Sequence, residues 1–150
     1  MTSFSGKHYY TVDSKGRIII PAPYREIIFA NYSPRLYITN ALFDKCLYLY
    51  PVEEWNKLQE FIKTKPRSDE AIKFFMRRVI ASAMEVEMDK QGRILIPYAL
   101  REDAQINEDV VIVGQIDRIE IWNKEEWHKL TDPTNIDRRF VEERLASFGF

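Results

Sequence analysis

A nine-residue stretch occurs twice in the chain, as DSKGRIIIP from Asp13 to Pro21 and as DKQGRILIP from Asp89 to Pro97. Six of the nine positions are identical, which chance rarely produces in so short a chain. In each copy Asp, two polar residues and Gly precede Arg and a short aliphatic run that ends at Pro, a pattern typical of a tight turn leading into a strand. The repeat therefore predicts two equivalent turn-and-strand units.

The residue types in the repeat suit a tight turn. A leading Asp accepts hydrogen bonds from backbone N–H groups ahead of it, and Gly adopts positive φ without steric cost. We therefore assign Asp13, Gly16, Asp89 and Gly92 to the structure of the two turns. The Arg that follows each Gly is left as the side chain that the turn presents.

The duplication extends beyond these nine residues. Residues 87–102 match residues 11–26 in register, and IEIWNKEEWHKL at 119–130 parallels LYLYPVEEWNKL at 47–58. A half of about 45 residues cannot bury an adequate core by itself. We expect two such halves to pair about a pseudo-two-fold axis and close one small β-barrel, which would also hide the strand edges.

The predicted fold class is α+β, and the chain divides into four segments. Residues 1–52 form the first half, 53–83 a pair of linking helices, 84–123 the second half and 124–150 the C-terminal helices. Ser68 is the predicted N-cap of the second linking helix. The apolar stripes on the helices exceed what a small barrel can cover, so they are assigned to core, to a subunit interface or to both.

Composition and spacing argue against several classes of protein. No apolar run approaches the ~20 residues that span a membrane, and Cys46, the one cysteine, is expected in the core of a cytoplasmic protein. His8 and His128 lie far apart in the chain, and no Cys accompanies either at metal-ligand spacing. There is no Gly-rich phosphate loop or nucleophile elbow. We therefore expect no enzyme, no metal, no cofactor and no membrane partner.

Charge is unevenly distributed along the chain, although the net charge is only −1. Residues 1–52 carry six Lys or Arg against three Asp or Glu, whereas the rest carries sixteen against twenty. Lys7, Lys15, Arg17 and Arg25 cluster about the first repeat. Such a local excess of cations can serve an anionic partner even when the total charge is near zero.

The duplicated Asp-x-x-Gly-Arg unit, with its aliphatic run, its Pro and a following Arg-Glu pair, resembles the MraZ family of bacterial proteins over almost the whole chain. The resemblance implies an AbrB-like swapped-hairpin β-barrel built from two tandem half-repeats, with flanking helices. It also implies a repressor that binds double-stranded promoter DNA and regulates the division and cell-wall gene cluster, including its own operon. Such a protein works at the nucleoid as a ring of identical subunits, for example an octamer.

The resemblance places the family's Asp-x-x-x-Arg motifs on the two repeated turns. The residues expected to contact DNA are Arg17 and Arg93, with Lys15 and Lys90 adding charge, and Arg25 and Arg101 as secondary candidates. The tips differ, with Ser14-Lys15 in one and Lys90-Gln91 in the other, so the two turns need not contribute equally.

Plainer interpretations stand beside these. Asp and Arg can simply pair across a tight turn, and most surface ion pairs carry no function. Arg25 and Arg101 can equally be packing or ion-pair residues. The alternative function is a structural ring or a protein-interaction module without DNA binding, whose turns meet an acidic partner protein.

Overall fold

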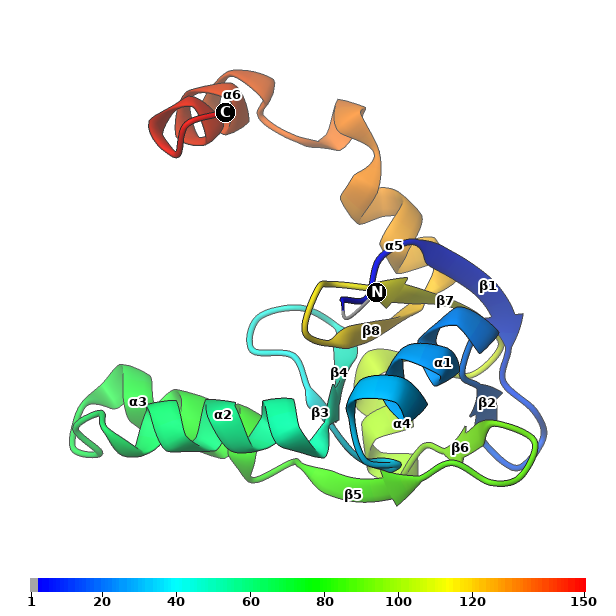
Figure 1. Cartoon of the computed structure of the whole chain (residues 1–150). Helices are drawn as coiled ribbons and strands as arrows, with labels where there is room; N and C mark the ends of the chain where they lie inside the picture. The colour runs from blue at the N-terminus through cyan, green and yellow to red at the C-terminus, as the bar shows by residue number, and fades with distance from the viewer. Residues whose placement is uncertain (1–2) are drawn as a thin grey trace.

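The computed structural model describes residues 3–150 and has the mixed α+β architecture that the sequence predicts (Figure 1). Met1 and Thr2, at the start of the predicted first half, lie outside the described residues. The elements of the first half and the linking segment are β1 (Lys7–Thr11), β2 (Arg17–Ile19), α1 (Ala22–Asn31), β3 (Arg35–Asn40), β4 (Cys46–Pro51), α2 (Val52–Lys63), α3 (Glu70–Phe75) and η1 (Met76–Ile80). Those that follow are β5 (Met84–Glu87), β6 (Arg93–Leu95), α4 (Tyr98–Ala104), β7 (Asp109–Gly114), β8 (Ile119–Asn123), α5 (Lys124–Thr131), η2 (Pro133–Asn135) and α6 (Arg138–Ser147).

A six-stranded antiparallel sheet in the order β1-β7-β8-β4-β3-β5 forms the centre of the molecule. The two repeats are related by symmetry in this sheet. Replacing each strand by its counterpart in the other repeat, β1 by β5, β3 by β7 and β4 by β8, gives the same order read from the opposite edge. The first strand of each repeat therefore pairs with the other repeat, β1 with β7 and β5 with β3. The two halves are intertwined, and each one completes the sheet of the other.

The strands that follow the repeated turns form a separate ladder, which we call the β2–β6 ribbon. The two strands are antiparallel, with Ile18 opposite Ile94 at the centre. The six-stranded sheet ends at β1 and β5, so its ladders do not close on themselves within residues 3–150. The predicted closed barrel is therefore not confirmed, because the ribbon is a second small sheet and does not continue the first.

Both faces of the large sheet are covered. On one face α1, α4 and the β2–β6 ribbon bury the main apolar core against alternate strand residues, including Leu47 and Leu49. On the other face α5 and the α2–η1 region cover Cys46, Tyr50 and Trp122. The alternation along β4 explains why its sequence is apolar at nearly every position. Cys46 is buried in this second layer, in line with its expected place in the core.

The linking helices differ from the prediction in two places. The N-cap of α3 is Asp69 and not Ser68, since the Asp69 carboxylate accepts hydrogen bonds from the backbone N–H groups of Ala71 at 2.8 Å and Ile72 at 3.3 Å. The α-helix that follows ends at Phe75 and continues as the π-helical turn η1. Over only five residues, the spacing of apolar positions does not distinguish a π-helical turn from an α-helix.

The C-terminal segment leaves the body of the protein. Helix α5 packs on β7 and β8, whereas α6 stands apart from the sheets at the end of a short connector (Figure 1). From residue 132 to residue 150 every side chain except Val141 is exposed. Within residues 3–150 no helix is long and apolar enough to cross a bilayer.

Candidate nucleic-acid interface

The first repeated turn is built around the Asp13 carboxylate. Its Oδ1 accepts hydrogen bonds from the backbone N–H groups of Lys15 and Arg17, both at 2.9 Å, and its Oδ2 accepts one from Arg17 Nε at 2.7 Å. The backbone closes the turn from Gly16 N to Asp13 O at 3.0 Å. The hydrogen bond from the Arg17 backbone contributes most to lowering the pKa of Asp13 to about 2.

The second turn repeats this arrangement. Asp89 Oδ1 accepts hydrogen bonds from the backbone N–H groups of Gln91 and Arg93 at 2.9 Å, and Asp89 Oδ2 accepts one from Arg93 Nε at 2.8 Å. The pKa of Asp89 is lowered, again chiefly by the hydrogen bond from the backbone of the following Arg. Each Asp thus carries out the turn-forming role and also fixes the position of its Arg.

The ion pair within the turn engages only part of each guanidinium. Arg17 and Arg93 donate to their Asp partners through Nε, and among the described residues no protein hydrogen bond uses their Nη atoms. The two side chains remain 29% and 27% exposed. The pairing that a plain structural interpretation expects is present, and it leaves the two Nη groups of each Arg available to an acceptor from outside the chain.

The β2–β6 ribbon places both arginines on one face. In its register Arg17 lies opposite Leu95 and Ile19 lies opposite Arg93, while the central pair between them is buried. Because side chains alternate along a strand, these four outer side chains point away from the core together. The two arginine positions are two residues apart along the ribbon, or about 7 Å.

The lysines at the turn tips are exposed but not equivalent. Lys15 directly precedes Gly16, and its backbone N–H bonds to the Asp of the turn. Lys90 directly follows Asp89, one position earlier in its turn than Lys15 is in the first. Each tip therefore carries one exposed lysine, placed differently on the two sides of the ribbon.

Arg25 and Arg101 lie against the turn of the opposite repeat. A Cβ atom added at Gly16 would lie 2.4 Å from Arg101 Cζ, and one added at Gly92 would lie 2.6 Å from Arg25 Cδ. Both glycines also have positive φ, +83° and +79°. Each turn therefore needs glycine for its backbone conformation, and a side chain at that position would also displace the arginine that crosses above it.

Backbone hydrogen bonds between the repeats accompany this crossing. Ile20 N donates to Gly92 O at 2.8 Å, and Ile96 N donates to Gly16 O at 3.0 Å. The crossing arginines bind the same segments, since Arg25 Nη1 donates to Ile20 O at 2.6 Å and Arg101 Nε donates to Ile96 O at 3.1 Å. The sequence offered one signal for this role: each of these arginines follows the Arg of its repeat by eight residues.

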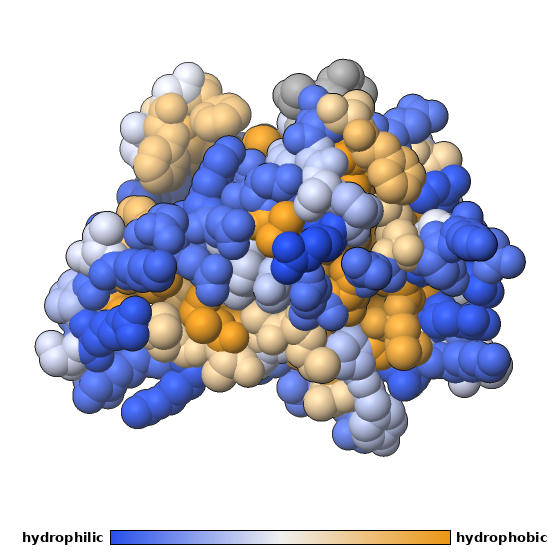
Figure 2. All heavy atoms as spheres, turned by 60° about the horizontal axis from the view of Figure 1, so that its bottom comes forward, coloured by the Kyte–Doolittle hydropathy of each residue, from blue (hydrophilic) through white to orange (hydrophobic). Residues whose placement is uncertain are grey.

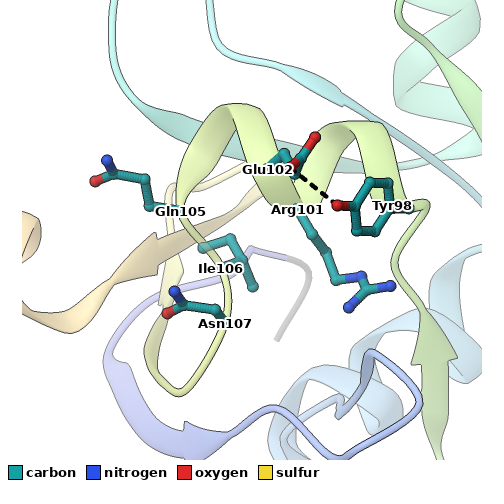
Figure 3. A pocket seen from close by; sticks show the side chains of 6 residues that line it. All are labelled: Tyr98, Arg101, Glu102, Gln105, Ile106 and Asn107. Atoms are coloured by element: carbon teal, nitrogen blue, oxygen red, sulfur yellow. Dashed lines mark hydrogen bonds between the residues drawn. The ribbon is translucent and has the colours of Figure 1, made fainter.

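Helix α4 adds a feature that the first repeat lacks (Figure 3). Tyr98 donates a hydrogen bond to Glu102 Oε1 at 2.9 Å, and the Arg101 guanidinium lies 5.5 Å from the centre of the Tyr98 ring. The matching position of the first repeat is Ala22. A shallow hollow of about 360 Å³ lies beside this group; its lining residues are Tyr98, Arg101, Glu102, Gln105, Ile106 and Asn107.

The histidines and the cysteine have structural surroundings. His8 meets Tyr24 edge-on at 5.1 Å between ring centres, and His128 stacks on Tyr9 at 6.0 Å. Burial raises the pKa of the Cys46 thiol and so disfavours the thiolate. Over the described part of the chain, no cluster of three or more His, Cys, Asp or Glu could hold a metal ion.

Fold and site together define an internally duplicated α+β protein whose two intertwined repeats present arginine-bearing turns on one ribbon. The family model described as "MraZ protein, putative antitoxin-like" matches residues 3–78 and again residues 79–148, and the chain belongs to the MraZ family. The resemblance inferred from the repeated motif is thereby confirmed. The boundary between the two matches falls within η1, before the start of the second half predicted at residue 84.

Relatives named "Transcriptional regulator MraZ" align over nearly their whole length. The protein of Caldanaerobacter subterraneus subsp. tengcongensis is 41% identical over 96% of this chain and 97% of its own. That of Acetivibrio thermocellus is 39% identical over 97% and 99%, and that of Clostridium tetani is 41% identical over the same shares. The sequence similarity to these relatives therefore extends over both repeats.

Proposed function

We propose that the protein is a DNA-binding transcriptional regulator that reads duplex DNA with the outer face of the β2–β6 ribbon. The relatives named as transcriptional regulators support the general role. The observation that carries the specific proposal is the register that places Arg17 and Arg93 on one exposed face. A two-stranded antiparallel ribbon fits the major groove of B-DNA, and an arginine with free Nη groups can bind guanine or phosphate there.

The two acidic residues of the turns do not face the DNA in this arrangement. Asp13 and Asp89 each accept three hydrogen bonds from their own turns, and these bonds stabilise the negative charge of the two carboxylates. Lys15 and Lys90, exposed at the tips, add attraction to phosphates. Arg25 and Arg101 act mainly by holding the turn of the opposite repeat in place, with a secondary contribution to the local positive potential.

A subunit with net charge −1 and a few cationic groups on one ribbon binds DNA weakly, because phosphate neutralisation supplies much of the affinity. We propose that self-assembly into a ring overcomes this by presenting several ribbons to several copies of a short promoter site. The resemblance to MraZ proteins supports a repressor of the division and cell-wall gene cluster, acting in the cytoplasm at the nucleoid. It also supports an AbrB-like interlocking of the two turn-bearing hairpins, in which the β2–β6 ribbon bridges the strand-exchanged halves.

The test is binding of the promoter DNA of its own operon, followed by fluorescence anisotropy at increasing salt. Wild-type affinity should fall steeply with salt, and the Arg17→Ala, Arg93→Ala double variant should bind at least about ten-fold more weakly, since each base-reading arginine contributes about 1–3 kcal/mol. Arg138→Ala is the matched control, because Arg138 is exposed on α6 and pairs with Glu142.

Affinity that ignores salt and is unchanged in the double variant would overturn the proposal. Salt-sensitive binding to an acidic protein, with none to DNA, would favour the interaction-module alternative.

A further inference from the structure

Two aliphatic side chains are exposed on the outer face of the β2–β6 ribbon. Ile19 is 41% exposed and Leu95 is 56% exposed, whereas Ile18 and Ile94, which precede them, lie in the main core. Figure 2, in which the lower side of Figure 1 comes forward, shows hydrophobic side chains at the surface between hydrophilic ones on the right-hand half, where β5 and β6 lie. A strand with one buried face ordinarily carries polar residues on the other. Both copies of the repeat depart from that pattern at the same position.

The hydrogen bonds of the ribbon alternate along its length. Ile20 N donates to Gly92 O, and Ile96 N donates to Gly16 O. In an antiparallel ladder, the pairs next to such hydrogen-bonded pairs exchange no backbone hydrogen bond, and their Cα atoms approach to about 4.5 Å. The outer face of the ribbon therefore consists of its two most closely approaching pairs of side chains.

Each of these close pairs combines an arginine with an aliphatic residue. Arg17 lies opposite Leu95, and Arg93 lies opposite Ile19. The turn holds each guanidinium through Nε, so the Nη groups are offered beside a hydrocarbon surface. A face that only neutralised phosphates would need the arginines and would gain nothing from the aliphatic partners.

The surroundings of Leu95 favour an uncharged ligand group. A hollow of about 340 Å³ lies beside this side chain; its lining residues are Met84, Glu85, Val86, Glu87, Leu95 and Pro97. Glu85 is paired with Arg35, and both carboxylates belong to β5 and not to the ribbon. Carboxylates repel a phosphate but not a methyl group.

The major-groove edges of the bases present the complementary pair of groups. Guanine offers the acceptors O6 and N7, which arginine binds, and thymine offers its C5 methyl group, which apolar side chains contact. Successive bases of one strand are about 3.4 Å apart along the helix axis. An arginine and an aliphatic side chain about 4.5 Å apart can therefore contact the same base pair or adjacent ones.

We propose that Ile19 and Leu95 read thymine through its C5 methyl group, each beside a guanine that is bound by the arginine it faces. Leu95 acts with Arg17, and Ile19 acts with Arg93. The inference rests on the proposed function and adds to it a preference for thymine beside guanine at two places along the site. The two places are related by the pseudo-two-fold axis of the ribbon.

Two duplexes that differ only in methyl groups test this reading. Both carry the promoter sequence of the protein's own operon, one with thymine and one with deoxyuridine at every thymine position. Fluorescence anisotropy at one fixed salt concentration should show the wild type binding the uracil duplex about ten-fold more weakly, since each buried methyl group accounts for about four-fold.

The matched variants show which side chains are responsible. The Ile19→Ala, Leu95→Ala double variant should bind the two duplexes equally, because the side chains that contact the methyl groups have been shortened. Phe29→Ala is the control, since Phe29 is 62% exposed on α1 outside the ribbon, and it should discriminate like the wild type. Discrimination that persists in the double variant would overturn the inference.

The wild-type comparison needs no substitution, so it decides the matter even if the double variant does not fold. Equal affinity of the wild type for the two duplexes would overturn the inference and leave the proposed function intact. Binding to neither duplex would overturn both. A double variant that assembles differently but discriminates like the wild type would show that another copy covers these side chains, and this outcome would also overturn the inference.

Single-site duplexes test the pairing with the arginines. One thymine at a time is replaced by deoxyuridine, and one guanine at a time by 7-deazaguanine, which lacks the N7 acceptor. The thymine whose effect disappears in Leu95→Ala should lie in the same base pair as, or next to, the guanine whose effect disappears in Arg17→Ala. The same should hold for Ile19→Ala with Arg93→Ala. A separation of more than two base pairs would overturn the pairing.

Discussion

The two repeated turns make the same hydrogen bonds but lie in different surroundings. Asp13 and Asp89 each hold two backbone N–H groups and one guanidinium Nε, at distances that agree within about 0.1 Å. Around them, Arg101 crosses the first turn while associated with Tyr98, whereas Arg25 crosses the second without an aromatic neighbour at the matching position. Residues inside the motif fix the turn, and residues outside it decide how firmly each turn is held.

This difference matters because each repeat depends on the other. The first turn is covered by an arginine from the second repeat and the second turn by one from the first. A change in one repeat should therefore be felt at the turn of the other. The predictions below use this crossing to compare the two turns.

The largest effect is expected from filling the space at the turn glycines. Gly16→Ala and Gly92→Ala should each lower the free energy of unfolding by about 2 kcal/mol, because alanine is strained at positive φ and its Cβ would collide with the crossing arginine. Urea denaturation measures both. If Gly16→Ala costs as much in the Arg101→Ala background as in the wild type, the collision contributes nothing and only the backbone strain is left.

A smaller effect should follow from removing the crossing arginines. Arg25→Ala should cost about 1 kcal/mol of stability through its hydrogen bond to the Ile20 carbonyl, and should speed amide exchange chiefly in residues 89–93. Arg101→Ala should do the reverse and loosen residues 13–17. Hydrogen exchange followed by mass spectrometry resolves the two segments. Exchange that rises in the turn of the same repeat would contradict the crossing.

Acid should weaken both turns, because protonation of Asp13 and Asp89 removes the charge that their hydrogen-bond donors stabilise. The pKa of Asp13 in the folded protein, about 2, lies below its ordinary value of 3.8, so its contribution to stability is complete above pH 4 and is lost as pH falls toward 2. Asp89 is shifted in the same direction. Denaturation midpoints measured from pH 7 to pH 2 should therefore fall less in Asp13→Asn and Asp89→Asn than in the wild type. Equal falls in all three proteins would show that other carboxylates dominate.

The smallest effect is expected at the turn tips. Lys15→Gln and Lys90→Gln should each weaken DNA binding a few-fold and lower the slope of log affinity against log salt by about 1, as expected for one phosphate contact. Lys45→Gln, at an exposed position outside the ribbon, is the control. A change in Lys15→Gln alone would mean that the first turn contacts DNA and the second serves as its structural counterpart.

The sequence predicted the turns well because their physics is local. Asp13, Gly16 and Arg17 act within five residues, so residue type and spacing suffice to describe their hydrogen bonds. The α+β class and the duplication could also be inferred from pattern alone. The family resemblance then followed from the motif and was confirmed over both repeats.

The remaining features depend on contacts between distant segments. The strand exchange and the open end of the large sheet at β1 and β5 follow from which partners the strands select, and hydrophobic alternation does not specify that. The sequence indicated secondary DNA contacts or packing for Arg25 and Arg101, and not their place over a turn, because the glycines that they cover lie in the other repeat. Helix α3 also begins one residue later than predicted, with Asp69 and not Ser68 as its N-cap, and residue propensities do not resolve a helix start to a single residue.

The exchange of first strands also sets an order for folding during synthesis. β5 finds β3 already made, since its partner precedes it in the chain. β1 pairs Lys7 with Val113, so it must wait for about 100 further residues, which a ribosome adding about 5–20 residues per second supplies after roughly 5–20 s. For that interval β1 has no native neighbour in the sheet. β1 therefore leaves the ribosome long before the strand with which it pairs.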